Sequence, residues 1–186
     1  MPIPTFDHND VLPPHVGDVT QSANMSPYRV SSLEVAQRFG ASPERATILL
    51  GWLDLRADLR RLNLGGGFQW LDGSFLEDVE KIRGVPPNDL DAVTFYQAPV
   101  GPVDPTVAAI ITDHTATKTR YRVDHYLVPL VDRPERLVDN SRFWFGLFSH
   151  QKATAVWKGM LHVDLMTDAV DSSARQHLLS LHPPTP

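Results

Sequence analysis

The sequence FQWLDGSFLEDVEKIRGVPPNDLDAVTFY, residues 68–96, contains the densest secondary-structure signals of the chain. Its apolar, aromatic start at Phe68–Leu71 suits a short strand, and a Gly-Ser pair follows as a tight turn. A helix-like segment at Phe75–Ile82 comes next, and a loop then leads into the alternating, β-branched run Asp89–Tyr96, which predicts a second strand. The order strand, turn, helix, strand predicts a sheet with helices packed on it.

On the N-terminal side of this stretch, the strongest signal is a long amphipathic helix. Ser42 is a good N-cap, and Pro43 suits the first helical position. The apolar residues that follow recur at spacings of four and three, which predicts one buried stripe: Ile48, Trp52, Leu55, Leu59 and Leu62. The arginines of this helix, Arg56, Arg60 and Arg61, are interpreted as its solvated face.

The remaining signals complete an α+β fold, in which a mixed β-sheet of about four strands is flanked by helices. Two further strands are expected at Tyr121–Leu130 and Trp157–Leu165. Other helices are expected at Ser32–Phe39, near Asp104–Thr115, at Pro134–Phe148 and at Ser172–Leu181. We expect residues 1–30 to form an extended N-terminal arm, residues 31–182 a single domain and residues 183–186 a tail.

Composition restricts the compartment and the chemistry. The chain has 186 residues, of which 42% are hydrophobic and 21% charged, enough for one core. It has no apolar run of about 18 residues, so we expect a cytoplasmic protein without a membrane partner. With no cysteine, disulfides, thiolate metal sites and cysteine nucleophiles are excluded. The net charge of −5 argues against a broad surface that coats nucleic acid.

Asp89 and Asp91 are the first candidates for chemistry. Residues two apart in a strand project from the same face, so these carboxylates are expected to share one small volume. Two such charges repel, and a cation relieves the repulsion. Mg²⁺ is typically held by one or two carboxylates together with water and substrate phosphate, so Mg²⁺ or Mn²⁺ is the predicted cofactor.

The Gly-Ser turn supplies a matching anion site. Gly73 lets the backbone approach a ligand closely, and the N-terminus of the predicted helix beyond it presents free N–H groups to an anion. Ser74 adds a hydroxyl donor. Asp124, on the third predicted strand, is a further metal ligand, and three carboxylates can hold two metal ions about 3.5–4 Å apart for nucleotidyl transfer.

These motifs resemble a known superfamily. The sequence WLDGSF at residues 70–75, followed by PNDLD at residues 87–91, is similar to the signature of the polymerase-beta-like nucleotidyltransferases. More narrowly, the chain resembles a small bacterial family of nucleotidyltransferase-like proteins, on segments such as LPP at 12–14, VDHYLVPL at 123–130, LFSH at 147–150 and KGM at 158–160. The chain departs from the family pattern with a carboxylate at Asp72, just before the turn, and with His125, which is expected to face outward.

The resemblance implies a nucleotidyltransferase-like fold and a division of roles. Gly73 and Ser74 would bind the triphosphate of a nucleotide such as ATP, and Asp89 and Asp91 would bind metal. Asp124 would complete the metal site or take the acceptor's proton. Relatives are often toxins or defence proteins, so a partner protein encoded by an adjacent gene is also expected.

A second polar cluster follows the aromatic helix. In one interpretation Ser149, His150, Lys152 and Lys158 bind nucleotide, with a lysine on phosphate and His150 orienting the nucleotide or the acceptor. In the other they belong to a surface loop between a helix and a strand. The remaining histidines, His114 among them, are interpreted as structural.

Three functions compete. The first is metal-dependent transfer of a nucleoside monophosphate from a nucleoside triphosphate to a hydroxyl on RNA, protein or a small molecule. The second is a catalytically silent nucleotide-binding or protein-interaction module of the same fold. The third is a metal-dependent phosphatase or nuclease, which would use the same acids without needing the Gly-Ser turn. Clustered, uncompensated carboxylates favour the enzyme.

Overall fold

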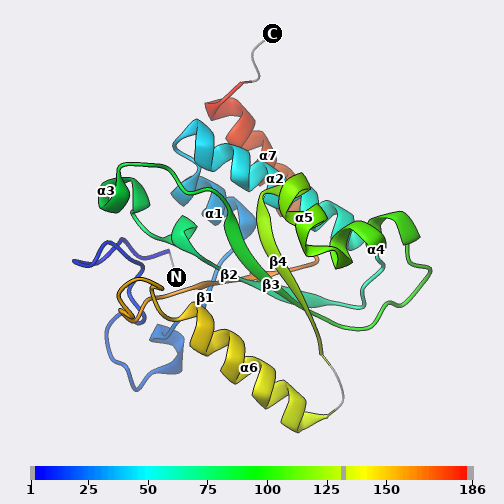
Figure 1. The fold of residues 1–186 in the computed structure, drawn as a ribbon, viewed down its shortest axis with the longest axis horizontal. Helices are drawn as coiled ribbons and strands as arrows, with labels where there is room; N and C mark the ends of the chain where they lie inside the picture. Colours follow the sequence, from blue (N-terminus) through cyan, green and yellow to red (C-terminus); the bar gives the residue numbers. More distant parts are fainter. Residues whose placement is uncertain (1–2, 131–132, 184–186) are drawn as a thin grey trace.

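The computed structural model describes residues 3–130 and 133–183, and it has the predicted α+β architecture (Figure 1). Within these residues the sheet has five strands in the order β1-β5-β2-β3-β4. They are β1 (Tyr28–Arg29), β2 (Gly67–Asp72), β3 (Leu90–Tyr96), β4 (Val123–Pro129) and β5 (Leu161–Asp164). The sheet is mixed, because β2 runs antiparallel to β3 and β5 while β3 and β4 are parallel.

Helices cover both faces of this sheet. The helix α6 (Pro134–Phe148) lies alone on one face, and the longer α2 (Pro43–Arg60) lies on the opposite face (Figure 1). The other α-helices are α1 (Ser32–Phe39), α3 (Val79–Arg83), α4 (Pro105–Thr112), α5 (His114–Tyr121) and α7 (Asp168–Leu181). Two short 3₁₀ turns are η1 (Ser22–Asn24) and η2 (Ser74–Leu76). None of the helices in the described part of the chain has the length and apolarity to cross a membrane.

Helix ends follow their caps. The Ser42 hydroxyl accepts a hydrogen bond from the backbone N–H of Arg45 at 3.2 Å, which fixes the start of α2 as predicted. Ser31 and Glu34 form a reciprocal capping box at the start of α1. The predicted stripe of α2 is confirmed, since its members from Ile48 to Leu62 are all buried.

Strand alternation divides the core into two clusters. On β3, Leu90 and Ala92 belong to the larger cluster on the α2 side, whereas Val93 and Phe95 belong to a smaller cluster with Trp144 of α6. Successive side chains of a strand point to opposite faces. Asp91 therefore points to the α6 face, as do the residues directly opposite it on β2 and β4.

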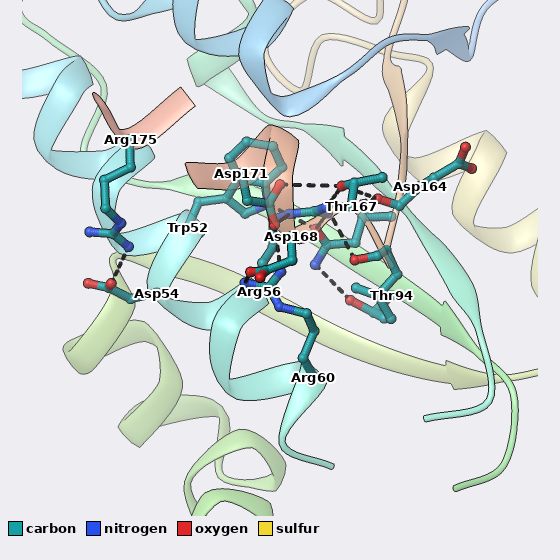
Figure 2. A network of polar contacts seen from close by, with 12 residues as sticks. Trp52, Asp54, Arg56, Arg60, Thr94, Asp164, Thr167, Asp168, Asp171 and Arg175 are labelled. Carbon is teal, nitrogen blue, oxygen red and sulfur yellow. Dashed lines mark hydrogen bonds and ion pairs between the residues drawn. The ribbon is translucent and has the colours of Figure 1, made fainter. Parts of the chain in front are cut away.

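The α2 face contains a buried polar network around Arg56, which was predicted to be solvated, whereas Arg61 is exposed as predicted. Arg56 is fully buried, and its Nε lies 2.9 Å from an oxygen of Asp171 of α7 (Figure 2). Gln69 bonds to Arg56 and Thr94, and Thr94 Oγ1 lies 2.7 Å from His125 Nε2. His125 is buried here, not outward-facing as expected, and burial lowers its pKa to about 3.

The segment after the Gly-Ser turn differs most from its prediction. The helix expected at Phe75–Ile82 is interrupted, because only η2 and the five-residue α3 form there. Arg45 donates hydrogen bonds to the carbonyl oxygens of Phe75 at 2.7 Å and Glu77 at 2.8 Å. Glu77 is extended, with φ −120° and ψ 158°, and pairs with Val11 in a β-bridge, so it interrupts the helix.

Candidate active site

Three aspartates lie in one row across neighbouring strands. Asp72 of β2 is directly opposite Asp91 of β3, and Asp91 is directly opposite Asp124 of β4. Asp89 lies just before β3 and two residues from Asp91, so it points to the same face. The acids predicted from the sequence therefore gather at one end of the sheet, beneath α6.

A cavity of about 700 Å³ opens beside this row. Of the nine predicted site residues, eight line it: Gly73, Ser74, Asp89, Asp91, Asp124, His150, Lys152 and Lys158. Its wall is completed by the end of α6, including Leu147 and Phe148. Residues separated by more than 80 positions in the sequence thus face a common space.

Gly73 is packed directly against the acid row. Its backbone has φ 84° and ψ −173°, a conformation that is essentially restricted to glycine. A Cβ added at this position would lie 1.8 Å from Oδ2 of Asp91. A glycine at position 73 is therefore required for the Asp91 carboxylate to lie where it does. Because η2 is a single turn, the predicted helix N-terminus is absent, and any anion binding here depends on the turn itself.

Lys118 of α5 joins two of the acids. Its Nζ lies 2.6 Å from Oδ2 of Asp89 and 3.2 Å from Oδ2 of Asp124. His114, one helical turn earlier, places Nε2 2.5 Å from the other oxygen of Asp124. Both oxygens of Asp124 therefore have a cationic or polar partner. In Asp89, a single oxygen, Oδ2, is paired with Lys118.

Asp91 is the exception. Among residues 3–130 and 133–183, no side chain forms a hydrogen bond or ion pair with its carboxylate. Burial, followed by the charges of Asp89 and Asp124, raises its pKa to about 6. For Asp124, burial raises the pKa, but the hydrogen bonds from Lys118, His114 and Tyr126 outweigh it and produce a net lowering. The charges of Lys158 and Lys118 lower the pKa of Asp91 in part without contacting it, so Asp91 is the acid of the site that lacks a direct partner.

Lys158 lies under the turn. Its side chain is 2% exposed, and its Nζ lies 2.9 Å from Asp72, 3.0 Å from Glu77 and 3.0 Å from the carbonyl oxygen of Gly73. Burial raises the pKa of Asp72 to about 7 despite this partner. Three oxygen acceptors surround the ammonium, so Lys158 holds the turn in place. It is therefore poorly placed for the phosphate contact that was predicted for it. Asp72 points to Lys158, and this ion pair explains how a carboxylate is tolerated just before the Gly-Ser turn.

The remaining predicted residues divide into two groups. His150 and Lys152 are exposed on the cavity wall, where they are free to meet a ligand. Ser149 is buried and does not line the cavity, and its hydroxyl lies 3.0 Å from Nδ1 of His150. The structure therefore brings this cluster to the site with the exception of Ser149.

Sequence reasoning missed Lys118 and His114. His114 was interpreted as structural, yet it contacts Asp124. The available signal was Asp113, an N-cap whose side chain accepts from the N–H of Ala116. It begins a new helix on which positions 114 and 118 share a face. A single predicted helix near Asp104–Thr115 concealed this pairing, since α4 and α5 are separate.

The acids fit a hard divalent cation by their chemistry, because carboxylate oxygens are the ligands that Mg²⁺ and Mn²⁺ prefer. Asp91 has a raised pKa and no partner, which is the condition that a bound cation would relieve. Within the described residues, however, no three acidic or histidine side chains form a preassembled ligand set. Lys118 occupies the space between Asp89 and Asp124 instead.

Comparison with known proteins adds a family without a function. The model of a protein family described as a family of unknown function, DUF6932, matches residues 4–164. No curated protein and no solved structure matches the chain.

Proposed function

The chain belongs to the DUF6932 family, whose function is unknown, and we propose that it is a metal-dependent nucleotidyltransferase. The acceptor is a hydroxyl on RNA, protein or a small molecule. The donor is a nucleoside triphosphate, which is abundant in the cytoplasm, the compartment that this proposal implies. A catalytically silent module is the alternative that the experiment below separates from it.

One observation supports this proposal above the others. The unpartnered carboxylate of Asp91 is packed against the glycine-restricted turn of Gly73, on the wall of a cavity that also carries Lys118 and Lys152. Asp91 is half-buried, and an acid that is partly removed from water without a partner is costly unless a ligand compensates it. A cation bound at Asp91 would compensate its carboxylate, and an anion bound beside it would occupy the turn at Gly73. A metal-bound triphosphate supplies the cation and the anion together.

The reaction would consist of one displacement. The acceptor hydroxyl oxygen forms a bond to the α-phosphorus and releases its proton to solvent water, the bond from that phosphorus to the bridging oxygen breaks, and pyrophosphate leaves. Mg²⁺ or Mn²⁺, when bound, would neutralise charge on the phosphate oxygens. Asp89 and Asp91 would hold the ion. The lowered pKa of Asp124 makes it a weak base, so we assign it to charge balance and not to taking the acceptor's proton.

Thermal melting tests the binding step. Mn²⁺ with a nucleoside triphosphate is expected to raise the melting temperature of the wild-type protein, and Asp91→Asn is expected to abolish the gain. Asp139→Asn is the matched control, because Asp139 is exposed on α6 and does not line the cavity. Equal gains in all three proteins would contradict the assigned site.

Isotope labelling tests the chemistry. The protein is incubated with a cell extract and a triphosphate labelled at either the α- or the γ-phosphorus. Label from the α-position alone in an acceptor indicates nucleotidyl transfer, whereas label from the γ-position indicates phosphoryl transfer. Binding without transfer of either label would favour the silent module.

A further inference from the structure

Lys118 occupies a position where a metal ion would otherwise lie. Its ammonium bridges Asp89 and Asp124, with Nζ–O distances of 2.6 and 3.2 Å. Two carboxylates that share one positive charge are the arrangement that a second divalent ion would also produce. We infer that Lys118 takes the place of one of the two cations expected for nucleotidyl transfer, so that the site binds a single divalent ion at Asp91 and Asp89. This inference rests on the proposed function.

The position of Lys118 is set by the fold. Asp113 caps the start of α5, and the Thr117 hydroxyl donates to the carbonyl oxygen of Ile110 at 2.7 Å, which fixes the helix beside the end of α4. His114 and Lys118 lie one turn apart and reach the two different oxygens of Asp124. Both oxygens of that carboxylate are therefore engaged by α5, which leaves Asp124 less available to a metal than Asp91.

The balance of charge also supports a single divalent ion. Around Lys118, the carboxylates of Asp89, Asp91 and Asp124 and the one ammonium leave two negative charges, which one divalent ion neutralises. The neighbouring acids Asp72 and Glu77 are paired with Lys158 instead. Asp91 has no partner among the described residues, and one oxygen of Asp89 is not engaged by Lys118. These are the oxygens available to the ion. The lack of a three-carboxylate or carboxylate–histidine ligand set in the described part of the chain agrees with this division.

The test is the stoichiometry of Mn²⁺ binding, measured from the electron paramagnetic resonance signal of free Mn²⁺ without nucleotide. We expect one Mn²⁺ per chain for the wild-type protein and for Lys118→Arg, which retains the charge. Lys118→Met removes the charge and frees Asp89 and Asp124, so it is expected to bind two. Lys81→Met is the control, because Lys81 is a lysine paired with an aspartate, Asp10, outside the cavity. It is expected to bind one.

The outcomes separate the inference from the proposed function. Two ions in the wild-type protein would show that Lys118 moves aside for metal, and one ion in Lys118→Met would show that it occupies no metal position. Either result overturns the inference and leaves the proposed function intact. No binding to the wild-type protein or to Lys118→Met would overturn both. A melting curve of each variant verifies folding, and two ions in the wild-type protein would overturn the inference even where a variant fails to fold.

Discussion

Gly73 is the residue at which backbone geometry and site chemistry are most closely joined. Its φ of 84° is unfavourable for any other residue, and an added methyl group would collide with the Asp91 carboxylate. Gly73→Ala is expected to destabilise the protein by about 1–3 kcal/mol from backbone strain. It should also reduce metal affinity, because Asp91 must move. Urea denaturation and Mn²⁺ titration measure the two effects.

Gly146→Ala provides the comparison for Gly73. This glycine lies within α6, and an added Cβ would meet nothing within 4 Å. Alanine is favoured over glycine in a helix by about 1 kcal/mol, so this variant is expected to be at least as stable as the wild-type protein. A Gly73→Ala protein as stable as Gly146→Ala would mean that the turn can adopt another conformation.

Single residues also show how far sequence reasoning reaches. The spacing of Asp89 and Asp91 was sufficient to predict that they face one volume, because strand alternation is a local rule. Lys118 and Lys158 were not predictable in their roles, since each pairs with acids on strands distant in the sequence. Arg56 was misinterpreted for the same reason. Its partner Asp171 is more than 100 positions away, and an arginine on an amphipathic helix is usually exposed.

At the scale of elements, four ion pairs join α2 and α7 in the described part of the chain, and two of them differ strongly in burial (Figure 2). Arg56 and Asp171 are 0% and 4% exposed, whereas Arg175 and Asp54 are 37% and 58% exposed. Arg56→Met is expected to cost about 3–5 kcal/mol of unfolding free energy, because it leaves a buried carboxylate with less compensation. Arg175→Met is expected to cost less than about 1 kcal/mol. Chemical denaturation of both variants measures the difference.

Arg60 limits the size of this effect. Its Nη1 also lies 2.6 Å from Asp171, so part of the compensation survives in Arg56→Met. The double variant with Arg60→Met should therefore lose more than the sum of the two single losses. Equal costs for Arg56→Met and Arg175→Met would contradict the view that burial determines the strength of these contacts.

Elements with strong local signals were predicted well, and those shaped by tertiary contacts were not. The cap at Ser42 and the apolar stripe of α2 depend on residues that are close in the sequence. Accordingly, α2 begins at the predicted residue. The predicted helix after Ser74 is interrupted at Glu77, which pairs with Val11 of the N-terminal arm and whose carbonyl oxygen accepts from Arg45 of a different helix. The strand β1 lies within the predicted extended arm, because two residues that pair with β5 carry too little local pattern to be recognised.

Across the whole molecule, the two faces of the sheet differ in whether their charged side chains have partners. On the α2 face, Arg56 and Asp171 neutralise each other and are hydrogen-bonded throughout. On the α6 face, Asp91 remains without a partner among the described residues while Asp89 and Asp124 raise its pKa. The first arrangement is the expected one for structure, and the second is typical of sites that bind a ligand.

The uncompensated charge of Asp91 predicts how the stability of the metal-free protein depends on pH. The folded-state pKa of about 6 exceeds the ordinary value of 3.8, so between these values the folded protein binds more protons than the unfolded chain. Stability from this residue is therefore present below the ordinary pKa and is lost as pH rises through 6. Asp91→Asn cannot ionise, so it should be more stable than the wild-type protein near neutral pH, by up to about 3 kcal/mol.

Denaturation at about pH 4 and about pH 8 measures this difference, which should be small at the lower pH and large at the higher one. Asp139→Asn, an exposed acid on α6, is expected to leave stability unchanged at both. Mn²⁺ should reverse the order at the higher pH, since a bound cation compensates the Asp91 carboxylate but finds no charge on asparagine. An advantage for Asp91→Asn that is independent of both pH and Mn²⁺ would place its cause in packing, and the charge argument for the site would then be wrong.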